Sequence, residues 1–191
     1  MLDMKITDHG TITIVGVDPG TNYTGVAIFT LELPTLKILN IDTKLLNVFG
    51  LENRNMVGTD LQERLKMIYD QFLGILNTVE PFTVSIESPF MNRLRPAAVG
   101  SLSQCLWALE LASFHHNKHL FVNKYPPSSV KNGVGAKGNA DKDAMMLAIL
   151  NHPEISSLIN GNLISEHEID AIAVAYIQLT NVRNNNIILL L

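Results

Sequence analysis

The hydrophobic pattern of the N-terminal part of the chain predicts three β-strands. Residues 11–18 are almost continuously apolar, which is typical of a strand that is buried on both faces. Residues 24–29 and 36–45 alternate in part between apolar and polar side chains. Turn-rich connections join the three segments, so we expect two successive hairpins.

A helix and a fourth strand are predicted next. Thr59 and Gln62 form a capping-box pattern. Apolar residues follow it at helical spacing, at Leu61, Leu65, Ile68, Phe72, Ile75 and Val79. Residues 82–87 then read as a short strand that ends in a carboxylate, and Pro89 prevents it from running on.

Residues 96–116 predict a long helix that is apolar on more than one face. One apolar stripe consists of Leu102, Leu106 and Leu109, and a second consists of Trp107, Leu111 and Phe114. Two interpretations of the second stripe stay open. The helix is either wedged inside the domain or packed against a partner subunit.

The rest of the pattern predicts a fifth strand over 120–124, a short helix from about Pro126, a glycine-rich loop over 133–139, and helices over 140–151 and 165–181. Residues 182–191 read as a polar linker with an apolar tip. The element order is β-β-β-α-β-α-β-α-α. It predicts an α/β fold in which a mixed five-stranded sheet carries helices on both faces.

Composition narrows the class of protein. The 191 residues, of which 47% are hydrophobic and 17% charged, describe one well-cored domain with its core at about 11–181. We expect no membrane partner, since no apolar run approaches the about 18 residues of a membrane span. We see no signal peptide, and the lone Cys105 agrees with a reducing compartment, so a cytoplasmic location is predicted.

The distribution of charge favours a nucleic-acid partner over one region only. The net charge of −4 argues against such a partner for the chain as a whole. Residues 91–137, however, contain six basic residues against one acidic residue: Arg93, Arg95, Lys118, Lys124, Lys131, Lys137 and Glu110. This segment therefore has a local charge suited to phosphates.

Acidic residues mark the ends of two predicted strands. Asp18 and Glu87 would lie side by side if these strands are parallel neighbours. Glu166, His167 and Asp170 stand near one face of the last predicted helix. Converging oxygen ligands of this kind suit Mg²⁺ or Mn²⁺.

Each acidic residue also has a purely structural interpretation. Asp18 precedes Pro-Gly and would serve as a turn former. Glu166 and Glu168 read as solvated acids that favour the helix dipole. Glu87 and Asp170 are harder to explain in this way, because a carboxylate within an apolar segment needs a partner.

Four sequence blocks resemble the RuvC-type Holliday-junction resolvases over about residues 14–180. They are Gly-Val-Asp-Pro-Gly-Thr at 16–21, Ile-Glu-Ser-Pro-Phe-Met at 86–91, Pro-Ser-Ser-Val-Lys at 127–131 leading to Gly-Asn-Ala-Asp-Lys at 138–142, and His-Glu-Ile-Asp-Ala at 167–171. The resemblance implies a ribonuclease-H-like fold, a homodimer, and metal-dependent cutting of four-way DNA junctions. Residues 1–10 and the longer segment between Thr35 and Asp60 depart from the family pattern and would fit a divergent phage or viral member.

The resemblance also implies which residues form the catalytic site. Asp18, Glu87, His167 and Asp170 would bind metal, with two Mg²⁺ ions per site that Mn²⁺ could replace, and Lys142 would be the active-site lysine. Family members carry Asp or His at the place of His167, which leaves Glu166 as a possible substitute ligand. The products would be 5′-phosphate and 3′-hydroxyl ends.

DNA contacts are also expected near this site. Phe90 resembles an aromatic residue that probes unstacked bases at the crossover, and its alternative is a place in the core. Met91, Arg93 and Arg95 follow it, close to backbone phosphates. Lys131 fills a matching basic position and Lys137 is a candidate for a nonspecific phosphate contact, unless each lysine is an ordinary surface charge.

Three other functions remain possible from the sequence. A ribonuclease-H-like nuclease would act on flaps, other branched DNA or RNA–DNA hybrid. An actin-like sugar kinase or ATPase would use Asp-x-Gly-Thr as a phosphate-binding hairpin, but this chain lacks the length for two lobes. A catalytically inactive DNA-binding module would leave the acidic set unused. The sequence does not say whether a branch-migration motor is a partner.

Overall fold

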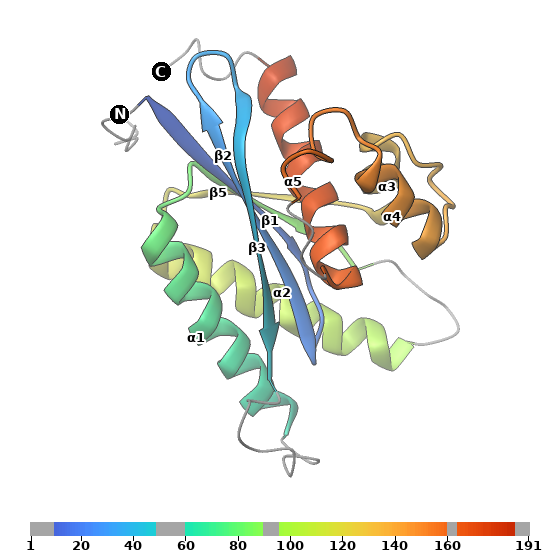
Figure 1. The fold of residues 1–191 in the computed structure, drawn as a ribbon. Helices are drawn as coiled ribbons and strands as arrows, with labels where there is room; N and C mark the ends of the chain where they lie inside the picture. The colour runs from blue at the N-terminus through green and yellow to red at the C-terminus, as the bar shows by residue number, and fades with distance from the viewer. Residues whose placement is uncertain (1–9, 49–59, 90–95, 160–163, 186–191) are drawn as a thin grey trace.

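The computed structural model describes residues 10–48, 60–89, 96–159 and 164–185. One mixed sheet lies between two layers of helices (Figure 1). Its strands, in spatial order, are β3 (Lys37–Asn47), β2 (Tyr23–Glu32), β1 (Thr11–Asp18), β4 (Thr83–Glu87) and β5 (Phe121–Tyr125). The pairs β1–β2 and β2–β3 are antiparallel, whereas β1–β4 and β4–β5 are parallel. The predicted hairpins and five-stranded mixed sheet are confirmed.

Among the described residues, five helices cover the two faces of the sheet. On one side lie α1 (Leu61–Val79) and α2 (Pro96–His116), and on the other lie α3 (Pro127–Gly133), α4 (Lys142–Leu150) and α5 (Glu166–Asn184), as Figure 1 shows. Each face has its own hydrophobic core. The α/β fold with helices on both faces is therefore as predicted.

Strand β1 contributes to both cores, which explains its continuous apolar sequence. Ile12 and Ile14 pack in the core beneath α5, while Val15 and Val17 pack in the core beneath α1 and α2. Successive side chains of a strand point to opposite faces. The alternation therefore places Asp18 on the same face as Ile14, under α5.

Helix α5 lies unusually close to the sheet. A Cβ atom on Gly16 would come within 2.3 Å of the Ala175 backbone nitrogen, so only glycine fits opposite the helix. The buried Ser85 hydroxyl donates toward the carbonyl oxygens of Val15, at 3.2 Å, and Val174, at 3.1 Å. The alanines at 171, 173 and 175 are all buried. Small residues therefore let this helix press onto the sheet.

The structure corrects the expectation for residues 182–191, which read as a linker. Helix α5 continues to Asn184, because Val182 is buried in the core and Arg183 pairs with Glu154 at 2.8 Å. Residues 186–191 lie outside the described residues.

The predicted start of α1 also differs from the structure. Asp60 occupies the N-cap position, and its side chain makes no capping hydrogen bond. Thr59, the expected partner of Gln62, lies outside the described residues.

The interpretation of α2 as a helix wedged inside the domain is wrong. Cys105 and Leu109 are buried in the core shared with α1. Trp107 and Phe114 are 63% and 58% exposed, so the second apolar stripe faces outward.

In the part of the chain that the structure describes, no helix is long and apolar enough to cross a membrane.

Candidate active site

Two carboxylates meet where strands β1 and β4 end. The parallel register pairs Gly16 with Ser85 and Val17 with Ile86, so Asp18 and Glu87 follow side by side. Both continue the face of the sheet that lies under α5, because Ser85 contacts α5 and side chains alternate along each strand. The predicted juxtaposition of the two acids is confirmed.

The first turn of α5 brings His167 and Asp170 to the same sheet edge. Ser165 caps the helix by accepting from the Glu168 backbone N–H, and the Glu168 carboxylate accepts from the Ser165 N–H at 2.9 Å. A Cβ on Gly25 would lie 1.9 Å from the carbonyl oxygen of His167. The absence of a side chain at this position thus lets the helix start close to Asp18.

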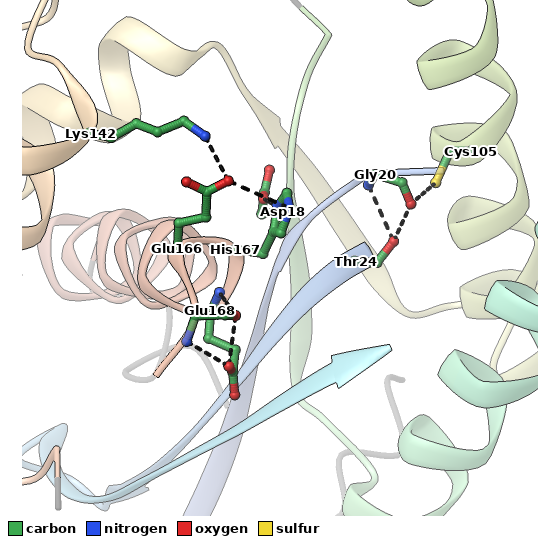
Figure 2. Close-up of polar contacts among 9 residues, drawn as sticks. Asp18, Gly20, Thr24, Cys105, Lys142, Glu166, His167 and Glu168 are labelled. Carbon is green, nitrogen blue, oxygen red and sulfur yellow. Dashed lines mark hydrogen bonds and ion pairs between the residues drawn. The ribbon is translucent and has the colours of Figure 1, made fainter. Parts of the chain in front are cut away.

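A chain of polar contacts runs from Asp18 to α4 (Figure 2). His167 Nδ1 lies 2.7 Å from Asp18 Oδ2, and His167 Nε2 lies 4.0 Å from Glu166 Oε1. The same Glu166 oxygen is 2.7 Å from Lys142 Nζ. The hydrogen bond to Asp18 raises the pKa of His167. Lys142 is therefore held beside the acidic residues, as expected, but its direct partner is Glu166.

The carboxyl groups are crowded and poorly solvated. Burial, and then the charges of Asp18 and Asp170, raise the pKa of Glu87 to about 8. Burial and the Asp18 charge raise the pKa of Asp170 to about 6. Burial also raises the pKa of Asp18, and it outweighs the hydrogen bond from His167, which acts in the opposite direction.

The donor set fits a divalent cation in its chemistry. Three partly buried carboxyls that repel one another are stabilised as anions when a hard cation lies between them. In their present positions, however, no three His, Cys, Asp or Glu side chains of the described residues form a ready metal-binding group. The Asp18 carboxylate is instead bonded to His167.

A small cavity of about 160 Å³ opens beside the acidic residues. Glu87 and Asp170 form part of its wall, and Lys131 and Lys142 form another part. Lys131 Nζ donates to the Ala140 carbonyl oxygen at 2.6 Å, which ties α3 to the start of α4. Anionic and cationic groups therefore share one enclosed space, as a site for a metal-bound phosphate requires.

Hydrogen bonds from two buried side chains hold the turn after β1 in place. The Thr24 hydroxyl donates to the Gly20 carbonyl oxygen at 2.8 Å and accepts from the Gly20 N–H at 3.2 Å. The buried Cys105 thiol, on α2, donates to the same carbonyl oxygen at 3.7 Å (Figure 2). Cys105 is a small buried residue that connects α2 to the turn that carries Asp18.

The other expected DNA contacts are placed only in part. Lys137 is exposed in the loop between α3 and α4. Phe90, Met91, Arg93 and Arg95 lie outside the described residues.

Sequence reasoning missed Tyr23 and the partner of Glu166, and it misread Glu168. The Tyr23 ring stacks on the His167 ring at a centroid distance of 6.1 Å, and nothing in the sequence marked it beyond its place after the Asp-Pro-Gly turn. Glu168 is not a solvated acid, contrary to expectation, because it accepts a hydrogen bond from Thr43 at 2.7 Å. Glu166 is half-exposed but paired with Lys142. Each of these contacts joins segments that are far apart in the sequence, so no local sequence pattern predicts it.

Comparisons with known proteins show which family this chain resembles. A family model described as "Crossover junction endodeoxyribonuclease RuvC" matches residues 14–179. Curated proteins of that name from Brachyspira hyodysenteriae and Alkaliphilus oremlandii are 28% and 32% identical to this chain. The matches cover 84% and 68% of this chain and 89% and 71% of the two relatives.

Solved structures share the fold. The RuvC structure from Thermus thermophilus is 23% identical, with a TM-score of 0.70 over 91% of this chain and 97% of that one. The yeast mitochondrial Holliday junction resolvase is 13% identical, with a TM-score of 0.59 over 90% and 81%. These matches bear out the ribonuclease-H-like fold that the sequence predicts.

Proposed function

Because the chain belongs to the RuvC family of crossover junction endodeoxyribonucleases, it is a Holliday-junction-resolving endonuclease, and we propose that Asp18, Glu87, His167 and Asp170 form its metal centre. One observation carries the assignment. Three partly buried carboxyls from β1, β4 and α5 converge on one crevice, and the pKa of two of them is raised by desolvation and by their neighbours' charges. Perturbed acids in a crevice are typical of catalytic sites.

The proposed centre uses Mg²⁺, two ions per site, with Mn²⁺ as a substitute. Held by the four residues, the metal supplies an activated water and positive charge at the phosphate for in-line hydrolysis of the phosphodiester. The P–O3′ bond breaks, which leaves a 5′-phosphate and a 3′-hydroxyl. His167 bonds Asp18 through Nδ1, so its Nε2 is the ring atom available to a metal or a proton.

The two lysines of the cavity act on the phosphate. Lys142 is exposed, and its ion pair with Glu166 is also largely exposed. Replacing Glu166 by a phosphate as the partner of Lys142 therefore costs little free energy. We assign it to charge neutralisation at the scissile phosphate. Lys131, tied to Ala140, and the exposed Lys137 bind neighbouring phosphates.

A homodimer supplies the second cut that resolution needs. Two nicks in strands of like polarity require two matched sites, which a twofold axis provides. The exposed Trp107 and Phe114 make the outer face of α2 the candidate interface. Four-way DNA is the proposed partner, and a cytoplasmic location stays a prediction.

Cleavage of an end-labelled four-way junction in Mg²⁺ tests the proposed site. Linear duplex, flap and RNA–DNA hybrid are cut in parallel. We expect paired symmetric nicks in the junction alone, and we expect them to vanish in Asp18→Asn and on addition of EDTA. Asp70→Asn, an exposed residue on α1, is the matched control and keeps full activity.

Two results would contradict the proposal. Cleavage of flap or hybrid at the same rate as the junction would point to a broader nuclease. Full activity of Asp18→Asn would remove this residue from the centre.

A further inference from the structure

A second cavity adjoins the catalytic acids on the side away from the lysines. Its volume is about 280 Å³, and Asp18 and Glu87 form part of its wall. Glu87 and Pro127 line both this cavity and the smaller one that contains Lys131 and Lys142. The two cavities therefore flank one set of carboxylates.

The second cavity differs from the first in chemical character. Pro19, Pro89 and Pro127 form much of its wall, together with Leu102 from α2. Ser88 contributes the one uncharged side-chain hydroxyl among its described lining residues. No lysine or arginine is among these lining residues, whereas two lysines line the first cavity. The first cavity suits a phosphate and the second suits a sugar and base.

The size of the second cavity limits what it accepts. Pockets for drug-sized ligands span about 300–1,000 Å³, so a cavity just below this range holds one nucleoside and not two. The walls are also stiff. Each proline has a fixed φ angle, and the Ser88 N–H donates to the Tyr125 carbonyl oxygen at 2.8 Å. Leu102 is the one flexible apolar side chain among the lining residues that the structure describes.

We propose that this cavity is the subsite for one nucleoside of the cut strand, next to the scissile phosphate, and that Leu102 determines which bases it accepts. The inference rests on the proposed function. A DNA strand whose scissile phosphate lies over Asp18 and Glu87, within reach of Lys142, would have its next phosphate toward Lys131 and a nucleoside toward the prolines. Base preference at that position then follows from contact with Leu102.

Two substitutions with opposite effects on cavity volume test the subsite. Junctions with each of the four bases at the nucleotides flanking the cut are cleaved by Leu102→Ala and Leu102→Trp. We expect Leu102→Ala to change the relative rates among the four bases by about tenfold, as loss of contact in a hydrophobic pocket does. We expect Leu102→Trp to fill the cavity and to reduce cleavage while junction affinity stays within about twofold, because phosphate contacts dominate affinity.

Matched controls and a binding measurement separate the possible failures. Leu106→Ala, on α2 but outside the cavity lining, keeps the base ranking of the parent protein. Junctions with 2-aminopurine beside the cut report the environment of that base in the Asp18→Asn background, and Leu102→Trp should change its fluorescence. Junction cleavage with an unchanged base ranking in both variants overturns the subsite alone. A parent protein that neither binds nor cuts junctions overturns the proposed function and the subsite together.

Discussion

Glu87 is a carboxyl group whose surroundings oppose its ionisation. Its ordinary pKa is 4.5, and burial together with the charges of Asp18 and Asp170 raises the folded-state pKa to about 8. Between these two values the folded protein binds more protons at this residue than the unfolded chain does. Stability from this group is therefore fully present below about pH 4.5 and is lost as pH rises toward 8.

Replacement of Glu87 by Gln should remove this loss. At pH 8 in EDTA we expect Glu87→Gln to be more stable than the parent by at least ~1 kcal/mol, the value of one pKa unit. At pH 5 the difference should shrink, because the parent carboxyl is then protonated in the folded protein. Chemical unfolding at several pH values measures both differences.

An exposed glutamate provides the control for this measurement. Glu63→Gln on α1 should show no such change between pH 5 and pH 8, since Glu63 is exposed. A stability difference for Glu87→Gln that did not depend on pH would show that the Glu87 charge is not penalised in the folded state.

At the scale of elements, the position of α5 decides whether the site exists. The helix carries His167 and Asp170, and the sheet carries Asp18 and Glu87. The two layers come together at glycines, and a Cβ on Gly25 would overlap the His167 carbonyl oxygen. Because the obstructing atom is backbone, the helix as a whole would have to move.

Gly25→Ala is therefore expected to lower stability and activity together. Overpacking of this kind costs roughly 1–3 kcal/mol of unfolding free energy, or more where backbone atoms collide. Gly74→Ala on α1 is the matched control, since nothing lies within 4 Å of its Cβ position. We expect this change to raise stability by ~0.5–1 kcal/mol, the helix advantage of alanine over glycine. Thermal unfolding and junction cleavage of both variants measure the contrast, and a fully active Gly25→Ala would contradict it.

At the scale of the whole molecule, the proposed metal centre and the proposed dimer interface lie on different surfaces. The carboxylates of the proposed metal centre lie at the ends of β1 and β4 and on α5, whereas α2, which carries the exposed Trp107 and Phe114, lies in the opposite helical layer (Figure 1). A groove of about 490 Å³ between α1 and α2 runs beside Trp107 and Tyr69. The Cys105 contact to Gly20 links the proposed interface to the turn that carries Asp18.

Trp107→Glu should disrupt the proposed dimer without unfolding the protein. The side chain is 63% exposed, so a charge there is tolerated in the monomer but not within an apolar interface. Light scattering should give the mass of a monomer, and junction cleavage should change from paired to single nicks. Leu147→Glu, at a position 59% exposed on α4, is the matched control and should remain dimeric. A dimeric Trp107→Glu would place the interface elsewhere.

The sequence by itself determined the elements and the candidate acids. Strand β1 and helix α2 have the predicted bounds, because apolar periodicity and prolines act locally. Asp18 and Glu87 stood out because each ends an apolar strand, which local sequence reveals. His167 and Asp170 are three residues apart, and this spacing alone puts them near one face of a helix.

Only the tertiary structure decided which partners these residues have. The pairing of Glu166 with Lys142, the stacking of Tyr23 on His167 and the hydrogen bond between Glu168 and Thr43 join separate elements. The same holds for the outward face of Trp107, since two apolar stripes on one helix do not say which of them meets the core. These features depend on distances between segments far apart in the chain, and such distances are fixed by packing of the sheet and helices, not by local pattern.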